Sequence, residues 1–168
     1  MALDRVRLSV LLFLWSVAGC GYYSFTGATI PTHLNTIAVP LAEDRSISTV
    51  QGLDERLTRL LVSRFVGQTR LSLEPEASNA DAVLEVVIDR YQSQPASVGG
   101  DEVATRNRIT INVTVIYRDQ VQDKELVRRS FSASEEFDAL DTAQEEVAAA
   151  AALEKIADDV FTAATSNW

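Results

Sequence analysis

The fold of this chain is decided by the stretch 108–117, which reads RITINVTVIY. Its odd-numbered residues are apolar and its even-numbered residues are polar, with Ile116 as the exception. Successive side chains of a β-strand point to opposite faces, so this alternation predicts a strand with one buried and one solvated face. Such a strand is typical of an antiparallel sheet that packs on the core through one face only.

Further strands are expected on both sides of this stretch. Residues 82–91 predict one, and residues 125–134 predict another that returns after a polar turn. In the first of these, one face is predicted to hold Ala82, Leu84, Val86 and Ile88, and the other to hold Val83, Glu85, Val87, Asp89 and Tyr91. A β-branched run at 36–40, ended by its proline, predicts a short strand, and 71–73 a brief extended segment.

A first helix is expected from Ser48 or Thr49, either of which can cap it, to about Phe65. Apolar residues recur through this segment at spacings of three and four and therefore share one helical face. Gly67 is placed to end the helix. The polar stretch 43–48 in front of the helix is predicted as a loop.

A second helix is expected at about 142–164, where Thr142 and Glu145 have the spacing of a capping box. Its apolar stripe is rich in alanine, which lets the helix approach a sheet closely. The elements together predict a single α+β domain over residues 36–168. In this domain, two helices pack on one face of a mostly antiparallel sheet of about four strands.

The first nineteen residues predict a removable signal peptide. Arg5 and Arg7 make a basic start, and the apolar run at 8–15 is too short to span a bilayer, which needs roughly 20 residues. The run leads into Val17-Ala18-Gly19-Cys20, which resembles the lipobox of bacterial lipoproteins. That resemblance implies cleavage before Cys20 and a covalent lipid on its sulfur. The alternative is an ordinary signal peptide with Cys20 as a buried thiol.

A lipid on Cys20 would hold the domain at a membrane, because each buried CH₂ group contributes about 0.8 kcal/mol. Gly21 stands where an Asp often retains lipoproteins at the inner membrane, which favours the periplasmic face of the outer membrane. Residues 20–35 are predicted as an extended lead-in. With one cysteine in the chain, no intramolecular disulfide is expected. The formal net charge of −9 disfavours nucleic acid as a partner.

Candidate catalytic residues are few. His33 is the only histidine, so the sequence offers no zinc-binding set and no Ser-His-Asp arrangement. Three carboxylate pairs are adjacent in sequence and therefore diverge in direction, which indicates solvated charge: Glu135/Glu136, Glu145/Glu146 and Asp158/Asp159. The sequence predicts a protein that is not an enzyme and that holds no metal and no cofactor apart from the lipid.

A long loop is expected at 93–105, between two predicted strands. It contains Pro95, Gly99 and Gly100, and it lacks the lysine and the further glycines of a phosphate loop. Hairpin connections of this length are uncommon in compact domains and are often functional. We therefore regard this loop as a candidate partner-binding loop, with a tolerated insertion as the alternative.

Arg106 and Arg108 lie two residues apart at the start of the best strand and should share a face with Thr110 and Asn112. Two guanidinium groups beside hydroxyl and amide groups could bind a phosphate bidentately. The alternative is a solvated strand end whose charges discourage aggregation. Arg128 could join the pair if the register of the hairpin allows.

The lead-in carries a further resemblance. Residues 20–27 read CGYYSFTG, and Ile30-Pro31, the run 36–40 and the helix at 53–65 follow them. In this combination the chain resembles the LptE family of lipopolysaccharide-assembly lipoproteins, over essentially all of the sequence after the signal peptide. The resemblance implies an outer-membrane lipoprotein that plugs an LptD-like β-barrel. The two proteins together would insert lipopolysaccharide into the outer leaflet.

The same resemblance implies roles for the candidate sites. In the family, basic residues on the sheet and an inter-strand loop handle lipopolysaccharide, and Arg106, Arg108 and the loop 93–105 match those positions approximately. The arginines would bind phosphate groups and the loop would reach toward the barrel. Two other readings stay open: an auxiliary lipoprotein of another envelope export complex, and a lipid-anchored hydrolase.

Overall fold

The computed structural model describes residues 29–96 and 106–166. Its body is an antiparallel sheet of three long strands, β4 (Ala82–Pro95), β5 (Arg106–Asp119) and β6 (Lys124–Asp138). The alternation that predicted β5 is confirmed, and β5 is the central strand of the three. All three strands are longer than predicted, because cross-strand pairing extends them beyond the segments with clear alternation.

Three short strands complete a six-stranded mixed sheet, with the order β3-β1-β4-β5-β6 and with β2 also paired to β4. They are β1 (Thr36–Ala38), β2 (Glu43–Asp44) and β3 (Ser72–Leu73), and all of them pair in parallel. The expected sheet of about four mostly antiparallel strands is therefore corrected. A two-residue strand has no periodicity to detect, and parallel pairing depends on a crossover connection that brings distant segments together.

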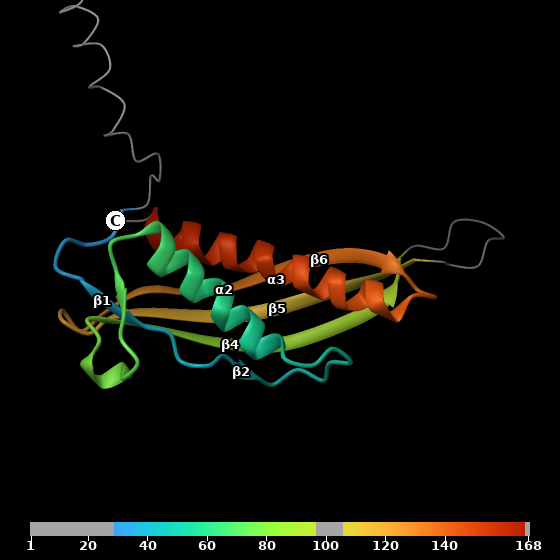
Figure 1. Cartoon of the computed structure of the whole chain (residues 1–168), viewed down its shortest axis with the longest axis horizontal. Helices are drawn as coiled ribbons and strands as arrows, with labels where there is room; N and C mark the ends of the chain where they lie inside the picture. Colours follow the sequence, from blue (N-terminus) through green and yellow to red (C-terminus); the bar gives the residue numbers. More distant parts are fainter. Residues whose placement is uncertain (1–28, 97–105, 167–168) are drawn as a thin grey trace, which may run out of the picture.

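Two helices, α2 (Leu53–Gln68) and α3 (Thr142–Thr165), cover the same face of the sheet, as predicted (Figure 1). A short 3₁₀ helix, η1 (Ala77–Asn79), lies between β3 and β4. No helix in the described part of the chain combines the length and the apolar composition that crossing a membrane requires.

The core fills the space between the helices and the sheet. Phe65 of α2 is fully buried in it, with ring centroids 5.8 Å from Tyr117 of β5 and 5.4 Å from Phe161 of α3. The predicted core face of β5 is confirmed, and each of its members is at most 1% exposed: Ile109, Ile111, Val113, Val115 and Tyr117. The opposite face of the sheet carries neither α2 nor α3; at its β1 end the short η1 packs on it, with Ala77 against the buried Ala38, Ala80 and Val83. The rest of this face, over β4, β5 and β6, is called the helix-free face below.

The limits of α2 differ from the prediction. Neither Ser48 nor Thr49 caps the helix, which begins at Leu53 after Gly52, a residue with φ of 71°. Gly67 lies inside the helix and does not end it. The helix ends at Thr69, whose hydroxyl bonds to the carbonyl of the preceding turn and accepts from a following amide. A side-chain cap of this kind satisfies the last carbonyl groups without a glycine.

The expected capping box at the start of α3 is also corrected. Asp141 is the N-cap, and its carboxylate accepts from the amide of Ala143 at 3.0 Å. Glu145 instead accepts hydrogen bonds from Tyr91 Oη at 2.8 Å and from Thr49 Oγ1 at 2.9 Å. The glutamate therefore joins β4 and the segment before α2 to the first turns of α3.

A bulge in β4 moves Tyr91 to the core face. Ile88 pairs with Val113 and Tyr91 pairs with Ile111, so Asp89 is the extra residue of β4. Strict alternation had placed Ile88 and Tyr91 on opposite faces, whereas the bulge places both in the core. The bulge leaves Asp89 exposed on the helix-free face.

Candidate functional site

The helix-free face of the sheet is lined by polar side chains that bond to one another across the strands. Thr110 bonds to Ser134 at 2.8 Å, and Ser132 donates to Asn112 at 2.7 Å. Each of these pairs is directly opposed in the register of β5 and β6. The expected solvated face of β5 is confirmed, and its polar groups hold one another in place.

Arg106 and Arg108 lie on this face at the start of β5, as predicted, and they share the carboxylate of Glu136. Arg108 Nη2 lies 2.6 Å from one oxygen of Glu136, and Arg106 Nε lies 3.6 Å from the other. The hydrogen bond from Arg108 is the main reason that the pKa of Glu136 is below its ordinary value, and both arginine charges contribute. Both arginine side chains remain more than half exposed.

This arrangement can bind an anion in competition with Glu136. Two guanidinium groups share the carboxylate of Glu136, and Asp138 stands opposite Arg106 in the register of β5 and β6. A hollow of about 100 Å³ adjoins Arg108 and is lined also by Gln92, Gln94, Pro95, Ala96 and Thr110. Pro95, expected in a loop, pairs with Asn107 as the last residue of β4 and forms part of this wall. Gly99 and Gly100 lie outside the described residues.

Arg128 does not join the pair. The register of β5 and β6 places it opposite Ile116, whereas Arg108 lies opposite Glu136. Eight residues of strand separate the two positions along β6, which is about 26 Å at 3.3 Å per residue. Arg128 instead binds Glu125 with its Nη2 at 2.6 Å, and that hydrogen bond raises the pKa of Arg128.

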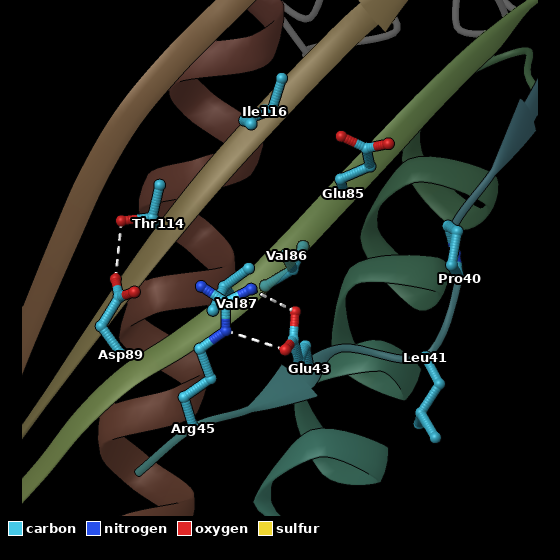
Figure 2. A pocket seen from close by; sticks show the side chains of 10 residues that line it. All are labelled: Pro40, Leu41, Glu43, Arg45, Glu85, Val86, Val87, Asp89, Thr114 and Ile116. Carbon is cyan, nitrogen blue, oxygen red and sulfur yellow. Dashed lines mark hydrogen bonds and ion pairs between the residues drawn. The ribbon is translucent and has the colours of Figure 1, made fainter.

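A larger hollow of about 520 Å³ lies on the same face, between the β2 segment, β4 and β5 (Figure 2). Arg45 binds both oxygens of Glu43, at 2.8 and 2.7 Å, while Asp89 accepts from Thr114 at 2.6 Å. The sequence did not indicate this hollow, because it depends on the pairing of β2 and on the bulge in β4. Of its acids, Glu43 and Asp89 are held by hydrogen bonds, and Glu85 lies 3.8 Å from Arg118 Nη2. The lining residues do not pair a nucleophile with a general base.

His33, the only histidine of the sequence, has a structural contact with a buried carboxylate. Its Nε2 lies 2.5 Å from Oδ2 of Asp119, which is 1% exposed. Burial alone would raise the pKa of Asp119, but hydrogen bonds from His33 and from backbone amides bring it below its ordinary value. A lone histidine gives no signal for a partner that lies 86 residues away along the chain. Within the described residues, no group of His, Cys, Asp and Glu could hold a metal ion.

The two ends of the sheet are far apart. Thr29, the first described residue, donates to the carbonyl of Thr165 at the C-terminal end of α3. Arg106 lies at the opposite end of β5, which has 14 residues and is about 45 Å long. Cys20 lies outside the described residues, so the lipid anchor remains an expectation.

A family model described as LptE, lipopolysaccharide-assembly, matches residues 34–164. None of the curated proteins is similar to the chain in sequence.

Several solved structures share the fold. An uncharacterized lipoprotein B from Nitrosomonas europaea aligns with a TM-score of 0.58 and 11% identity, over 85% of this chain and 88% of its own. The rare lipoprotein B from Shewanella oneidensis aligns with a TM-score of 0.53 and 15% identity, over 76% and 92%. A neuraminyllactose-binding hemagglutinin homolog from Helicobacter pylori aligns with a TM-score of 0.57 and 11% identity, over 84% and 88%. At these identities the likeness concerns the fold alone, and the fold is shared by proteins with different names.

Proposed function

Since the chain belongs to the LptE family of lipopolysaccharide-assembly proteins, we propose that it is an outer-membrane lipoprotein that partners and plugs an LptD-like β-barrel. The observation that carries this proposal is the family match over residues 34–164, which runs from just before β1 to the last turn of α3. The family is non-catalytic and has no known cofactor, in keeping with a role in binding.

The proposal includes a lipid anchor at Cys20. Residues 1–19 act as the signal peptide, and residues 20–35 connect the lipid to the domain as an extended lead-in. Support comes from the lipobox-like sequence and from the contacts of Thr29 and His33, which fasten the described part of the lead-in to one end of the sheet. The opposite end of the domain then extends away from the anchor.

At that opposite end we propose contacts with lipopolysaccharide and with the barrel. Arg106 and Arg108 bind phosphate groups of the glycolipid, and a phosphate displaces Glu136 because it offers more negative charge. The segment 97–105, with Gly99 and Gly100, and the adjoining Pro95 contact the barrel. The position of Arg106 at the start of β5, beside Ala96, supports the proximity of these two surfaces.

Affinity purification of the tagged chain from solubilised outer membrane tests the proposed partnership. We expect a large β-barrel at one copy per copy of the chain, and depletion of the chain should reduce surface lipopolysaccharide. Recovery with an inner-membrane transporter would instead indicate an auxiliary export lipoprotein. A protein recovered alone that hydrolyses an envelope substrate would indicate the lipid-anchored hydrolase.

A pair of double variants tests the arginine site. Arg106→Ala with Arg108→Ala removes two charge-assisted contacts of about 1.5–3 kcal/mol each, so lipopolysaccharide binding should weaken by at least about tenfold. The matched control, Arg118→Ala with Arg128→Ala, removes two arginines from the same face at the other end of these strands. Equal binding by both double variants would contradict the assignment of the site.

A further inference from the structure

The outer edge of β4 is paired along only part of its length within residues 29–96 and 106–166. β1 and β2 pair with β4 no further than Ile88, whose carbonyl accepts from the amide of Arg45 at 3.0 Å. Beyond this point, residues 91–95 pair with β5 on one side and with no described strand on the other. An unpaired strand edge offers backbone donors and acceptors to another chain.

The hydrogen bonds of β4 show which backbone groups of this edge point outward. The amide of Ala96 donates to a carbonyl of β5 at 2.9 Å, so Ala96 faces β5. Because the backbone groups of successive strand residues point to alternate sides, those of Tyr91, Ser93 and Pro95 point away from β5. Proline is accepted in a strand where its missing N–H would have faced outward, which fits Pro95. The edge therefore offers the amides of Tyr91 and Ser93 and the carbonyl groups of all three residues.

The side chains along this edge do not oppose an added strand. Residues 91–95 read YQSQP and carry no charge, and Ser93, Gln94 and Pro95 are exposed. Charged side chains commonly protect sheet edges from pairing. The edge on the other side of the sheet is protected in this way, since β6 carries charges that are bound within the chain: Glu125 by Arg128, Glu136 by Arg108 and Glu135 by Lys155. Of these two edges, the one on β4 is suited to an added strand.

We propose that an extended loop of the barrel partner adds to β4 at residues 91–95 as a short strand. This inference rests on the proposed function, in which the barrel contacts Pro95, the last residue of the edge. The wall strands of a closed barrel are paired on both sides, so the loops are the parts of the barrel with free backbone groups. Main-chain hydrogen bonds supply the affinity in such strand additions.

The added strand lies beside the candidate phosphate site. Gln92 and Gln94 line the hollow of about 100 Å³ together with Arg108 and Thr110. A strand paired with β4 continues this wall beyond the two glutamines. The barrel loop therefore reaches the same hollow as Arg108, and the two proteins line the site together.

Photo-cross-linking in the full-length chain, expressed in its own membrane, tests the occupant of the edge. A p-benzoylphenylalanine in place of Gln94 should cross-link to a loop of the barrel. The same probe in place of Gln92 should reach that loop about two residues away, because side chains on one face of a strand are two residues apart. Ser134 of β6 gives the matched control, since it lies in the same row of the sheet, opposite Thr110, which is opposite Gln92. A probe there should not reach this loop.

A pair of proline variants tests the backbone hydrogen bonds. Ser93→Pro removes the outward amide at the centre of the edge, so recovery of the barrel in affinity purification should fall severalfold. On β6 the amide of Ser134 also points outward, because Asn107 of β5 faces β6 and pairs with Phe137. Ser134→Pro is therefore the matched control and should leave recovery of the barrel unchanged. Neither amide bonds to β5, so the thermal unfolding midpoints of both variants should stay close to that of the parent.

The proposal fails if the probes at Gln92 and Gln94 reach only wall strands, a second copy or no protein. It also fails if folded Ser93→Pro recovers as much barrel as Ser134→Pro. Should Ser93→Pro not fold, the cross-linked peptides decide the question alone. The parent chain separates this inference from the proposed function: if the parent recovers a barrel and the edge variants behave like their controls, only the added strand is wrong. If the parent recovers no barrel, both are wrong.

Discussion

One end of the sheet, called the closed end, receives residues 29–36 through contacts between distant residues, and the other, called the open end, carries Arg106 and Arg108. At the closed end, Thr29 bonds to Thr165, His33 binds Asp119, and Asp81 accepts from the amides of Asn35 and Thr36. At the open end, Leu140 is 89% exposed, Val147 is 69% exposed, and both arginines of β5 are more than half exposed.

The two ends of the sheet therefore differ in role: the closed end attaches the domain to the lead-in, and the open end is available to bind a partner. The closed end receives the lead-in, so its contacts hold the domain in a defined position relative to the chain before it. At the open end, large aliphatic side chains and two arginines face outward, where a partner could cover them. Substitutions should therefore affect stability at the closed end and binding at the open end.

The largest effect is expected from a substitution that disrupts the packing at the closed end. Phe65→Ala removes the ring that lies between Tyr117 and Phe161, and we expect it to lower the free energy of unfolding by about 3–5 kcal/mol. Leu140→Ala, the matched change at the open end, should cost less than about 0.5 kcal/mol. Urea denaturation of both variants measures the two changes in the free energy of unfolding. Similar decreases in the two variants would contradict the expected difference between the ends of the sheet.

Asp119→Asn should have the next largest effect, about 1–3 kcal/mol at pH 7, because it removes the buried charge that His33 and the amide of Gln122 bind. The pKa of Asp119 in the folded protein is below its ordinary value of 3.8. Its contribution is therefore present above about pH 4 and is lost as the pH falls through the lowered pKa.

Acid denaturation curves of the parent protein and the Asn variant measure this contribution. The gap in unfolding free energy between the two should narrow below pH 4. A gap that is constant from pH 7 to pH 3 would show that the carboxylate charge contributes nothing.

Two glycines sharpen the comparison within one helix. Gly67 lies inside α2 near the closed end with open space where a Cβ would point, so Gly67→Ala should raise the free energy of unfolding by about 0.5–1 kcal/mol. Gly52, before the helix, has φ of 71°, so Gly52→Ala should lower it by about 1 kcal/mol. Thermal unfolding of both variants gives the direction of each stability change. A change in the same direction for both would contradict the observed limits of α2.

The smallest expected change concerns binding at the open end. Glu136→Gln removes the carboxylate that Arg106 and Arg108 share, so phosphate-dependent lipopolysaccharide binding should strengthen severalfold while the unfolding free energy hardly changes. The matched control is Glu125→Gln, which frees Arg128 at the closed end. Titrations of both variants with lipopolysaccharide test the arginine site. Tighter binding by the Glu125→Gln control alone would show that the phosphate site is not at Arg106 and Arg108.

Several parts of the fold followed from local patterns. The alternation from Ile109 to Tyr117 and the stripes of the two helices predicted their elements and buried faces, because backbone geometry sets these periods within a few residues. Other parts depended on pairing between distant segments. Neither the bulge at Asp89 nor the parallel strand β2 leaves a periodic trace in the sequence.

The candidate site divides in the same way. The sequence by itself determined that Arg106 and Arg108 share a solvated face, because side chains two residues apart in a strand point in the same direction. Only the tertiary structure decided that Glu136 contacts both of them, that Arg128 lies far from them, and that His33 reaches the buried Asp119. These contacts follow from strand register and chain crossing, which depend on the free energy of the whole core and not on any local run of residues.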